Sequence, residues 1–263
     1  MEMRLQEVDF YYGSRVVLDH VDLSIDPGRT TVIVGASGSG KSILLKVLAG
    51  LLPPHRGRVL WDGKNIFDLS QDEEVRYRKR SSFVFQDAAL WSNRTIRQNV
   101  EFPLQVHFPE LSVQQREEKV RYYLDKVAYQ DSIEYRPEQI SAGERKMVSL
   151  ARALVTRPKT LFMDSPLTDI DATSVEGIKS IIKKLHSERR TIIACFVDPE
   201  FISLMADDLI VLHRGRVLAH GPFHQVKKSS DPLVRGVLAM VLNEVTAYDD
   251  DILDLLNSEE QLL

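Results

Sequence analysis

Two stretches near the start of the chain, RLQEVDFYYG and VLDHVDLSID, alternate apolar and polar residues, which predicts β-strands with one buried face. Asp26-Pro27-Gly28 predicts a turn after them. The next stretch, TTVIVG, is short and continuously apolar, as in a parallel strand that is buried on both faces. From Ser42 onward apolar residues recur at helical spacing. The pattern therefore predicts strands, a glycine-rich break and a helix.

The rest of the chain changes its periodicity several times. SSFVFQD predicts a buried strand that ends at Gln86, and residues 93–157 carry a charged, helical pattern. Strand patterns return at Thr160 to Met163 and at Thr191 to Phe196, with a helix at Val175 to His186 between them. This order predicts a β-rich start, an α/β core with a helical insertion, and then the core again.

Composition excludes several classes of protein. The net charge of −4 over 263 residues gives no global basic field for nucleic acid. A single cysteine, Cys195, excludes a disulfide framework, and its apolar neighbours favour a buried position in a strand. We expect no secretory signal at the N-terminus, and apolar runs such as Leu44 to Leu52 are too short to cross a bilayer. These features predict a cytoplasmic chain.

The stretch GASGSGKS matches the G-x-x-x-x-G-K-[ST] pattern of a phosphate-binding loop. Glycines let backbone N–H groups turn toward a phosphate without Cβ clashes. We expect the lysine to reach the terminal phosphates, the last serine to bind Mg²⁺, and the helix N-terminus to add its positive dipole. The preceding strand and following helix favour this interpretation over a chance turn. The candidate nucleotide-binding residues are Gly35, Ser37, Gly38, Ser39, Gly40, Lys41 and Ser42.

Further motifs indicate which kind of phosphate-binding-loop protein this chain is. ISAGERKMVSLARAL resembles the signature helix of the ATPases of ABC transporters, with Ser141, Gly143 and Glu144 where that family has Ser, Gly and Gln. TLFMD, which ends at Asp164, resembles the family's magnesium strand. FVFQD resembles the segment whose glutamine, here Gln86, touches the metal and senses the membrane subunit.

Two single residues fit the same resemblance. Tyr12 lies where the family stacks an aromatic ring on adenine, and Asp171 where it keeps the aspartate of the dimer-contact loop. Alone, Tyr12 also fits a half-buried strand tyrosine, Gln86 a solvated turn, and SAGE an ordinary helix cap. The order of the motifs from about residue 3 to 225 carries the resemblance.

The resemblance implies a fold and a domain order. The fold is an α/β P-loop NTPase of ABC type, with a mostly parallel core sheet, an N-terminal antiparallel β subdomain and a helical insertion. The ATPase domain is expected over residues 1–225, with a helical subdomain at about 87–157 inserted into a RecA-like core. Residues 226–263 are expected to form a C-terminal helical extension, whose first helix starts after the cap Ser230-Asp231-Pro232.

The resemblance also implies ATP and Mg²⁺ as cofactors. Ser42, Gln86 and Asp164 are the expected metal-binding residues. In the family two ATP molecules lie between two such domains, so Ser141 and the backbone at Gly143 would clamp nucleotide that is held on another subunit.

Two substitutions affect the expected cleavage site. Ser165 stands where the family has the glutamate that orients and polarises the attacking water, and a serine hydroxyl cannot accept that proton at neutral pH. A positioned base typically raises the rate of such a reaction by ~10²- to 10⁴-fold. Val197 replaces the histidine that contacts the γ-phosphate, and the neighbouring Asp198 has the wrong charge to approach a phosphate. These positions predict a chain that binds ATP, with its own hydrolysis slow or supplied by a partner ATPase.

The implied partners are a multi-span membrane permease and a second ABC ATPase in a homo- or heterodimer, which would place the chain on the inner face of the cell membrane. LAHGPFHQVKKSSDPLVRGVL resembles the C-terminal region of ATPases that serve MCE-protein phospholipid transporters, which adds an MCE-type lipid-binding protein to the expected partners. An importer of amino acids or other small solutes, and an ATP-gated regulatory subunit without significant hydrolysis, remain alternatives.

Other classes of nucleotide-binding protein fit the sequence less well. A small-molecule kinase would need an acceptor pocket and no ISAGE motif, and ABC proteins of translation or DNA repair usually carry two such domains or a long coiled coil. The basic run RYRKR at 76–80 is interpreted as a solvated helix end. The acidic end after Val245, with Ile252, Leu255 and Leu256, is expected either to remain in solvent or to dock onto the neighbouring ATPase.

Overall fold

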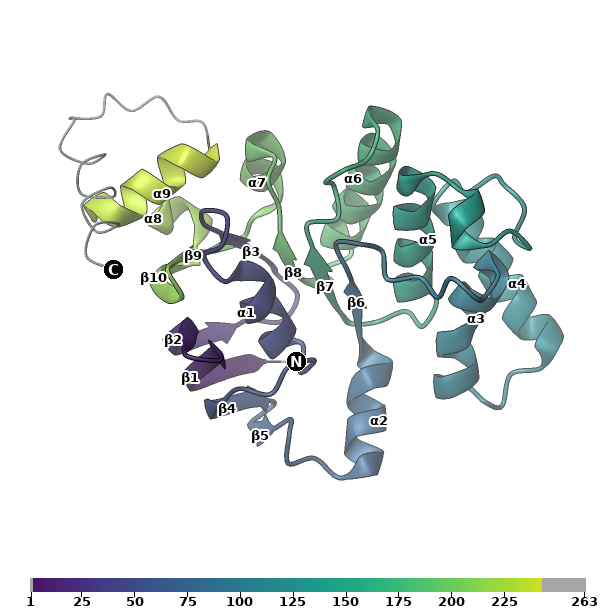
Figure 1. Ribbon diagram of the computed structural model, residues 1–263, viewed down its shortest axis with the longest axis horizontal. Helices are drawn as coiled ribbons and strands as arrows, with labels where there is room; N and C mark the ends of the chain where they lie inside the picture. Colours follow the sequence, from purple (N-terminus) through teal and green to yellow (C-terminus); the bar gives the residue numbers. More distant parts are fainter. Residues whose placement is uncertain (1, 243–263) are drawn as a thin grey trace. The chain divides into compact units, whose positions relative to one another are not determined.

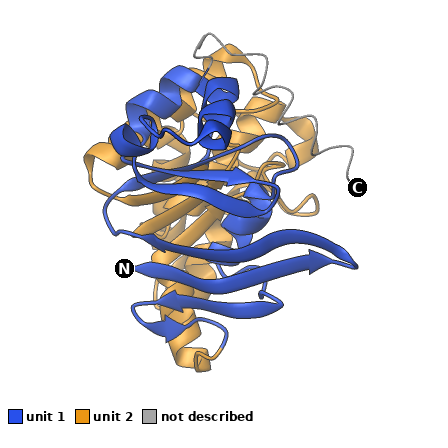
Figure 2. Cartoon of the chain, turned by 90° about the vertical axis from the view of Figure 1, so that its left-hand side faces the viewer, with its two compact units in different colours: residues 1–67, 195–263 blue, residues 68–194 orange. Residues whose placement is uncertain are grey.

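The computed structural model describes residues 2–242 (Figure 1). The chain divides into two compact units (Figure 2). Unit 1 takes in residues 1–67 and 195–263, and unit 2 takes in residues 68–194. Each unit is formed by elements whose type follows from the local sequence pattern.

Unit 1 begins with a four-stranded sheet in the order β2-β1-β4-β5. Its long strands pair antiparallel, and buried and exposed residues alternate along much of β2 because one face covers the core. The predicted β-rich start is therefore confirmed. The strands are β1 (Met3–Tyr12), β2 (Arg15–Ile25), β4 (Arg56–Trp61) and β5 (Lys64–Asn65).

A second group of strands in unit 1 holds the glycine loop. All five residues of β3 are buried, as the continuous apolar run predicts, and β3 pairs parallel with β9, which pairs antiparallel with β10. Helix α1 follows the loop directly. The elements of this part are β3 (Thr30–Val34), α1 (Lys41–Leu48), α7 (Pro199–Met205), β9 (Asp208–His213), β10 (Arg216–Pro222), α8 (Phe223–Val226) and α9 (Pro232–Leu242).

Unit 2 contains parallel strands and most of the helices. Strand β6 pairs parallel with β7, and β8 follows β7 in the sheet order. The five residues of β7 and of β8 are buried. Cys195, the last residue of β8 and the first residue of the second segment of unit 1, is buried as expected. The elements are α2 (Gln71–Arg80), β6 (Ser81–Val84), α3 (Ile96–His107), α4 (Val113–Lys126), the short 3₁₀ helix η1 (Pro137–Gln139), α5 (Ala142–Leu154), β7 (Thr160–Asp164), α6 (Ala172–Ser187) and β8 (Thr191–Cys195).

Several predicted boundaries differ from the structure by one to three residues, among them both ends of α6 and the end of β8. The predicted end of β6 is wrong. Strand β6 ends at Val84 and not at Gln86. The chain leaves the ladder at Phe85, whose carbonyl accepts a hydrogen bond from the Ala88 N–H at 3.1 Å, and this turn replaces strand pairing. The basic run RYRKR forms the end of α2, as interpreted from the sequence.

Polar caps fix where the helices of unit 2 begin. Helices α3, α4 and α5 start with capping boxes, in which a serine or threonine hydroxyl accepts from the third backbone N–H and a glutamine or glutamate reaches back. Helix α6 is capped by Asp171, the residue before its start, whose carboxylate accepts from the Ser174 N–H. The caps satisfy backbone donors that a helix start leaves without partners.

The last described helix, α9, starts as the sequence predicts. The Asp231 carboxylate accepts from the N–H groups of Leu233 and Val234 at 2.8 and 3.2 Å. The apolar face of α9 is largely buried against elements of its own unit, including α7 and β9. Residues 243–263, with the expected docking tail, lie outside the described residues. Among residues 2–242, no helix is long and apolar enough to cross a membrane.

Candidate functional site

The glycine loop between β3 and α1 has the backbone of a phosphate cradle. Gly35, Gly38 and Gly40 have φ angles of 156°, 78° and 104°, which residues with a Cβ rarely adopt. Gly40 is also the first residue before α1, so backbone N–H groups of the loop continue into the N-terminus of the helix.

At two of these positions the neighbouring backbone leaves room for no residue larger than glycine. A Cβ on Gly35 would collide with the Leu212 carbonyl oxygen of β9, and a Cβ on Gly40 would lie 2.8 Å from the Val17 carbonyl oxygen of β2. Gly215, in the turn between β9 and β10, donates its N–H to the Ser39 carbonyl at 3.0 Å and also approaches Val17. The sequence reading missed Gly215, although the Arg-Gly-Arg stretch around it signals a tight turn.

Two side chains test whether the loop suits a phosphate. The Lys41 ammonium donates to the carbonyl oxygens of Gly35 and Ala36, both at 2.7 Å, so the lysine lies over the loop. The Ser39 hydroxyl is buried, and no described residue forms a hydrogen bond with it. A bound phosphate would supply acceptors for the Lys41 ammonium and the Ser39 hydroxyl. The residues present therefore fit a nucleoside triphosphate.

Tyr12 lies at the end of β1 in the same unit. Its side chain is 58% exposed, and its ring forms an edge contact with Phe10 at 5.4 Å between centroids. This exposure suits a ring that stacks on a ligand better than it suits a half-buried strand tyrosine.

Asp164 ends β7 in unit 2 and is 97% buried, with an exposed fraction of 3%. The next residue, Ser165, takes a φ of +46°. The Ser165 carbonyl accepts from the Lys146 ammonium at 3.2 Å and from the Thr168 hydroxyl at 3.0 Å. These contacts hold the backbone of the turn and do not depend on the Ser165 side chain.

Lys146, on α5, is a further residue of this region that the sequence reading missed. Burial lowers its pKa below the usual value, while the nearby carboxylates of Asp87, Asp164 and Asp169 act in the opposite direction. The Lys146 ammonium offsets part of the negative charge of these carboxylates, and its hydrogen bond to the Ser165 carbonyl joins α5 to this turn.

Gln86 is exposed in the segment that follows β6. The chain just after it is anchored by Arg152 of α5, whose guanidinium donates to the carbonyl oxygens of Ala88 at 2.8 Å and Ala89 at 2.6 Å. Burial lowers the pKa of Arg152 to about 10. Helix α5 therefore holds both the Gln86 segment and, through Lys146, the turn at Ser165.

Val197 lies in unit 1, two residues after the end of β8, and its side chain is 57% exposed. The adjacent Asp198 caps α7, because its carboxylate accepts from the Phe201 N–H at 3.0 Å. Asp198 thus has a structural role, and neither residue presents an imidazole or another cationic group.

The signature residues begin α5 with a capping box. The Ser141 hydroxyl accepts from the Glu144 N–H at 3.2 Å, and the Glu144 carboxylate accepts from the Ser141 N–H at 2.7 Å. Hydrogen bonds from the Ser141 hydroxyl and backbone hold the pKa of Glu144 below its usual value. The structure therefore shows that SAGE forms a helix cap, and this cap is compatible with the resemblance to the signature helix.

Gly143 brings the signature helix against the start of α6. A Cβ at this glycine would collide with the Ser174 hydroxyl and lie 2.6 Å from an Asp171 carboxylate oxygen. Asp171 caps α6, and its Oδ2 accepts from the Ser174 hydroxyl at 2.6 Å. Hydrogen bonds from Ser174 lower the pKa of Asp171. The structure thus joins two residues that the sequence reading assigned to separate motifs.

The predicted site residues fall into two groups. Unit 1 carries Tyr12, the glycine loop and Val197, and unit 2 carries the others. Within unit 2, the caps of α5 and α6 lie in contact, and α5 also anchors the turn at Ser165. The unit 2 group consists of Gln86, Ser141, Gly143, Glu144, Asp164, Ser165 and Asp171.

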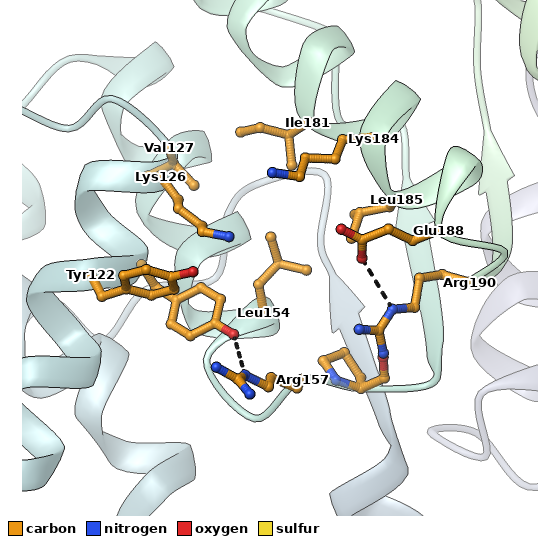
Figure 3. A pocket seen from close by; sticks show the side chains of 12 residues that line it. Tyr122, Lys126, Val127, Leu154, Arg157, Ile181, Lys184, Leu185, Glu188 and Arg190 are labelled. Carbon is orange, nitrogen blue, oxygen red and sulfur yellow. Dashed lines mark hydrogen bonds and ion pairs between the residues drawn. The ribbon is translucent and has the colours of Figure 1, made fainter.

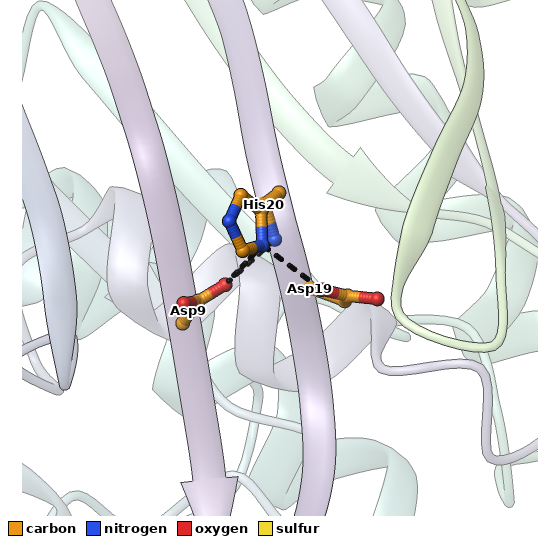
Figure 4. A group of neighbouring side chains, drawn as sticks. All are labelled: Asp9, Asp19 and His20. Carbon is orange, nitrogen blue, oxygen red and sulfur yellow. Dashed lines mark hydrogen bonds and ion pairs between the residues drawn. The ribbon is translucent and has the colours of Figure 1, made fainter.

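A separate cluster in unit 1 joins Asp9, Asp19 and His20 (Figure 4). The His20 Nδ1 lies 3.1 Å from a carboxylate oxygen of each aspartate. Asp9 also accepts from the Tyr11 hydroxyl, and Asp19 pairs with Arg216 at 2.7 Å. Because other donors already occupy both carboxylates, this cluster is a hydrogen-bonded charge network between β1, β2 and β10.

The ABC transporter family model matches residues 18–168, more than half of the chain. The chain belongs to the ABC transporter family. It is an ATP-binding domain of that family, and the α/β P-loop fold of ABC type predicted from the sequence is confirmed.

Curated relatives and solved structures agree with this assignment. The chain is 33% identical to the intermembrane phospholipid transport ATP-binding protein MlaF of Haemophilus influenzae, over 87% of each chain. It is 34% identical to the methionine import ATP-binding protein MetN of Corynebacterium efficiens over 80% of its own length, but it spans only 58% of that relative. A solved dimeric ATP-binding cassette in a post-hydrolysis state with ADP and Pi superposes with a TM-score of 0.77 at 28% identity, over 84% of this chain and 98% of that one.

Replacing Gly143 with alanine tests the contact between the two caps. We expect Gly143→Ala to lower the free energy of unfolding by about 1–3 kcal/mol, because the added Cβ displaces Ser174 and Asp171. The control is Gly177→Ala on α6, where a Cβ meets only a Met147 methyl at 3.5 Å. The control should be neutral or stabilising in urea unfolding. Equal midpoints for the two variants would contradict the contact.

The Asp9–Asp19–His20 network predicts a dependence of stability on pH. The hydrogen bond to Asp19, followed by the charge of Asp9, raises the pKa of His20 above 6.5. The stabilisation by protonated His20 is therefore complete below the unfolded-state pKa of about 6.5 and is lost as pH rises through the folded-state pKa. His20→Asn, which tolerates the residue's φ of +48°, should remove this dependence in urea unfolding at pH 5.5 to 8.5. A His20 pKa at or below 6.5 in an NMR titration would refute it.

Proposed function

We propose that this chain is the Mg-ATP-binding subunit of an ABC transporter and that it hydrolyses ATP slowly by itself. The observation that carries the proposal is the pairing of an intact glycine loop with Ser165 directly after the buried Asp164. Nucleotide binding needs the loop, whereas fast cleavage needs a base that a serine hydroxyl does not provide.

ATP would be held from several directions. Lys41 exchanges its contacts with Gly35 and Ala36 for phosphate oxygens, the loop N–H groups and the α1 N-terminus bind the same anion, and the buried Ser39 hydroxyl gains a partner. The resemblance assigns Ser42, Gln86 and Asp164 as the residues that would hold Mg²⁺, whose charge would offset that of the phosphates. Tyr12 offers an exposed ring for the adenine.

Two side chains that the family uses for hydrolysis, a glutamate and a histidine, are absent from this chain at Ser165 and Val197. Ser165 contributes its carbonyl to Lys146 and Thr168, and its short hydroxyl replaces a carboxylate that would orient and deprotonate water. Val197 offers only an apolar side chain, and Asp198 is engaged as the cap of α7. Both losses reduce cleavage, and they leave the glycine loop and Lys41 in place.

The signature of this chain would then act on a partner's nucleotide. Ser141, the backbone at Gly143 and the N-terminus of α5 would together bind the phosphate of that nucleotide, and the position of Ser141 at the start of α5 supports this role. A second ABC ATPase with a complete cleavage site would use it, and a membrane permease would hold the pair at the inner face of the membrane.

We propose that the cargo is phospholipid and that the transporter moves it between membranes. Similarity to MlaF over 87% of both chains supports this choice, as does α9, which begins at the Asp231-Pro232 pair. An MCE-type lipid-binding protein would then belong to the complex. Small-solute import is the second candidate, which the 34% identity to MetN favours.

The isolated chain should bind Mg-ATP but turn it over well below ~1 s⁻¹, the lower end of ordinary enzyme rates. Lys41→Ala should abolish binding, because the loop loses its phosphate-binding ammonium. Ser165→Glu combined with Val197→His should raise hydrolysis toward the ~10²- to 10⁴-fold effect of a positioned base. Calorimetry and a phosphate-release assay measure the two quantities. Turnover of 1 s⁻¹ or faster in the unaltered chain would refute the proposal.

The purified native complex tests the role of the signature. Ser141→Arg should abolish its ATPase activity, because the bulky cation blocks the surface offered to the partner's nucleotide. Lys41→Ala should reduce the activity less, because this chain's own site cleaves slowly. Native mass spectrometry should show a second, different ATPase. Two copies of this chain and no other ATPase would refute the asymmetric arrangement.

A further inference from the structure

Unit 2 contains a pocket of about 300 Å³ that includes none of the nucleotide-motif residues (Figure 3). Its walls come from α4, from α6 with the turn before β8, and from the end of α5 with the loop that leads to β7. The lining residues are Tyr122, Tyr123, Lys126, Val127, Leu154, Arg157, Pro158, Ile181, Lys184, Leu185, Glu188 and Arg190.

The floor of the pocket is apolar. Tyr123, Val127, Leu154 and Pro158 are buried, whereas the charged lining residues are exposed or half-buried. The volume lies at the lower end of the range of ~300–1,000 Å³ for small-molecule sites, which combine apolar walls with a few charged groups. A compact apolar body therefore fits below a charged rim.

The rim carries an excess of positive charge. It has four cations, Lys126, Arg157, Lys184 and Arg190, but one carboxylate, Glu188, which lies 3.6 Å from the Arg190 guanidinium. The Lys184 ammonium has no ion pair among the described residues. These cations act on the hydroxyl of Tyr122. Its pKa is lowered by a hydrogen bond with Lys126 and by the charges of Lys126, Arg157 and Lys184.

Two of the cations are held in place. The Arg157 backbone has a φ of +53°, and its Nε donates to the Tyr123 hydroxyl at 3.1 Å, which is its one side-chain hydrogen bond in residues 2–242. Arg190 donates to the Pro158 carbonyl at 3.0 Å. Guanidinium groups fixed in this way bind an anion with little further loss of side-chain entropy.

We propose that this pocket is a second ligand site and that it binds an organic phosphate monoester with a compact aromatic or acyl body. A phosphate monoester carries ≈ −1.5 to −2 charge at pH 7, which matches the three cations without a carboxylate partner better than a carboxylate does. The arginine fork suits phosphate oxygens, and the buried floor takes the body of the ligand. Both a nucleoside monophosphate and a phosphatidic acid headgroup with short chains have this chemistry.

Calorimetric titration of the full chain tests the site. The probes are adenosine monophosphate, dihexanoyl phosphatidic acid below its micellar concentration, and inorganic phosphate. Each is titrated into the unaltered chain and into Lys41→Ala, which disables the glycine loop. We expect one of the two organic probes to bind with equal affinity to both proteins and at least ~10-fold more tightly than inorganic phosphate, and that probe identifies the source of the ligand.

Matched variants locate the binding. Lys184→Gln should weaken it at least ~10-fold, in line with loss of a charge-assisted contact, whereas Lys183→Gln on the same helix, outside the lining, should not. Arg157→Gln should weaken binding as well. Lys184→Gln keeps the test decisive if loss of the Tyr123 contact unfolds Arg157→Gln.

Three outcomes would overturn the proposal. The first is no saturable binding of either organic probe at millimolar concentration. The second is binding that Lys183→Gln and Lys184→Gln weaken equally, which would describe a solvated charged surface. The third is binding that disappears in Lys41→Ala, which would belong to the glycine loop and not to the pocket.

Discussion

Backbone-to-backbone contact around the glycine loop is the constraint on which the nucleotide site depends. The carbonyl oxygens of Val17 and Leu212 approach the loop so closely that Gly40 and Gly35 have no room for a side chain. The turn at Gly215 reaches Ser39 in the same way. Strands β2, β9 and β10 therefore define the loop's shape before any ligand arrives, and this preorganisation lets successive N–H groups face one anion.

Unit 2 is organised around α5. The helix starts with the Ser141 capping box, contacts the Asp171 cap through Gly143, and anchors two functional segments through Lys146 and Arg152. A displacement of α5 would move all of these groups together. The signature of the ABC transporter family thus has a structural role inside this chain besides any contact with a partner.

This framework does not depend on the side chains of Ser165 and Val197, for a physical reason. The Ser165 turn is held through its carbonyl, and the segment after β8 is held by the Asp198 cap. Backbone contacts keep the shape that binds nucleotide, whereas cleavage depends on single side chains. The proposed separation of ATP binding from hydrolysis therefore needs substitutions at two positions and no change in fold.

The sequence predicted the elements, the glycine loop and the cap at Asp231 from periodicity and from residues close together in the chain, and it predicted the missing base at Ser165 through the resemblance to the ABC transporter family. It placed the end of β6 wrongly, since the turn at Phe85 interrupts an unbroken apolar pattern. Only the tertiary structure revealed the bracing by Gly215, the role of Lys146, the Asp9–Asp19–His20 network and the cationic pocket. These sites join residues from distant parts of the chain, and their spacing in sequence carries no periodic signal.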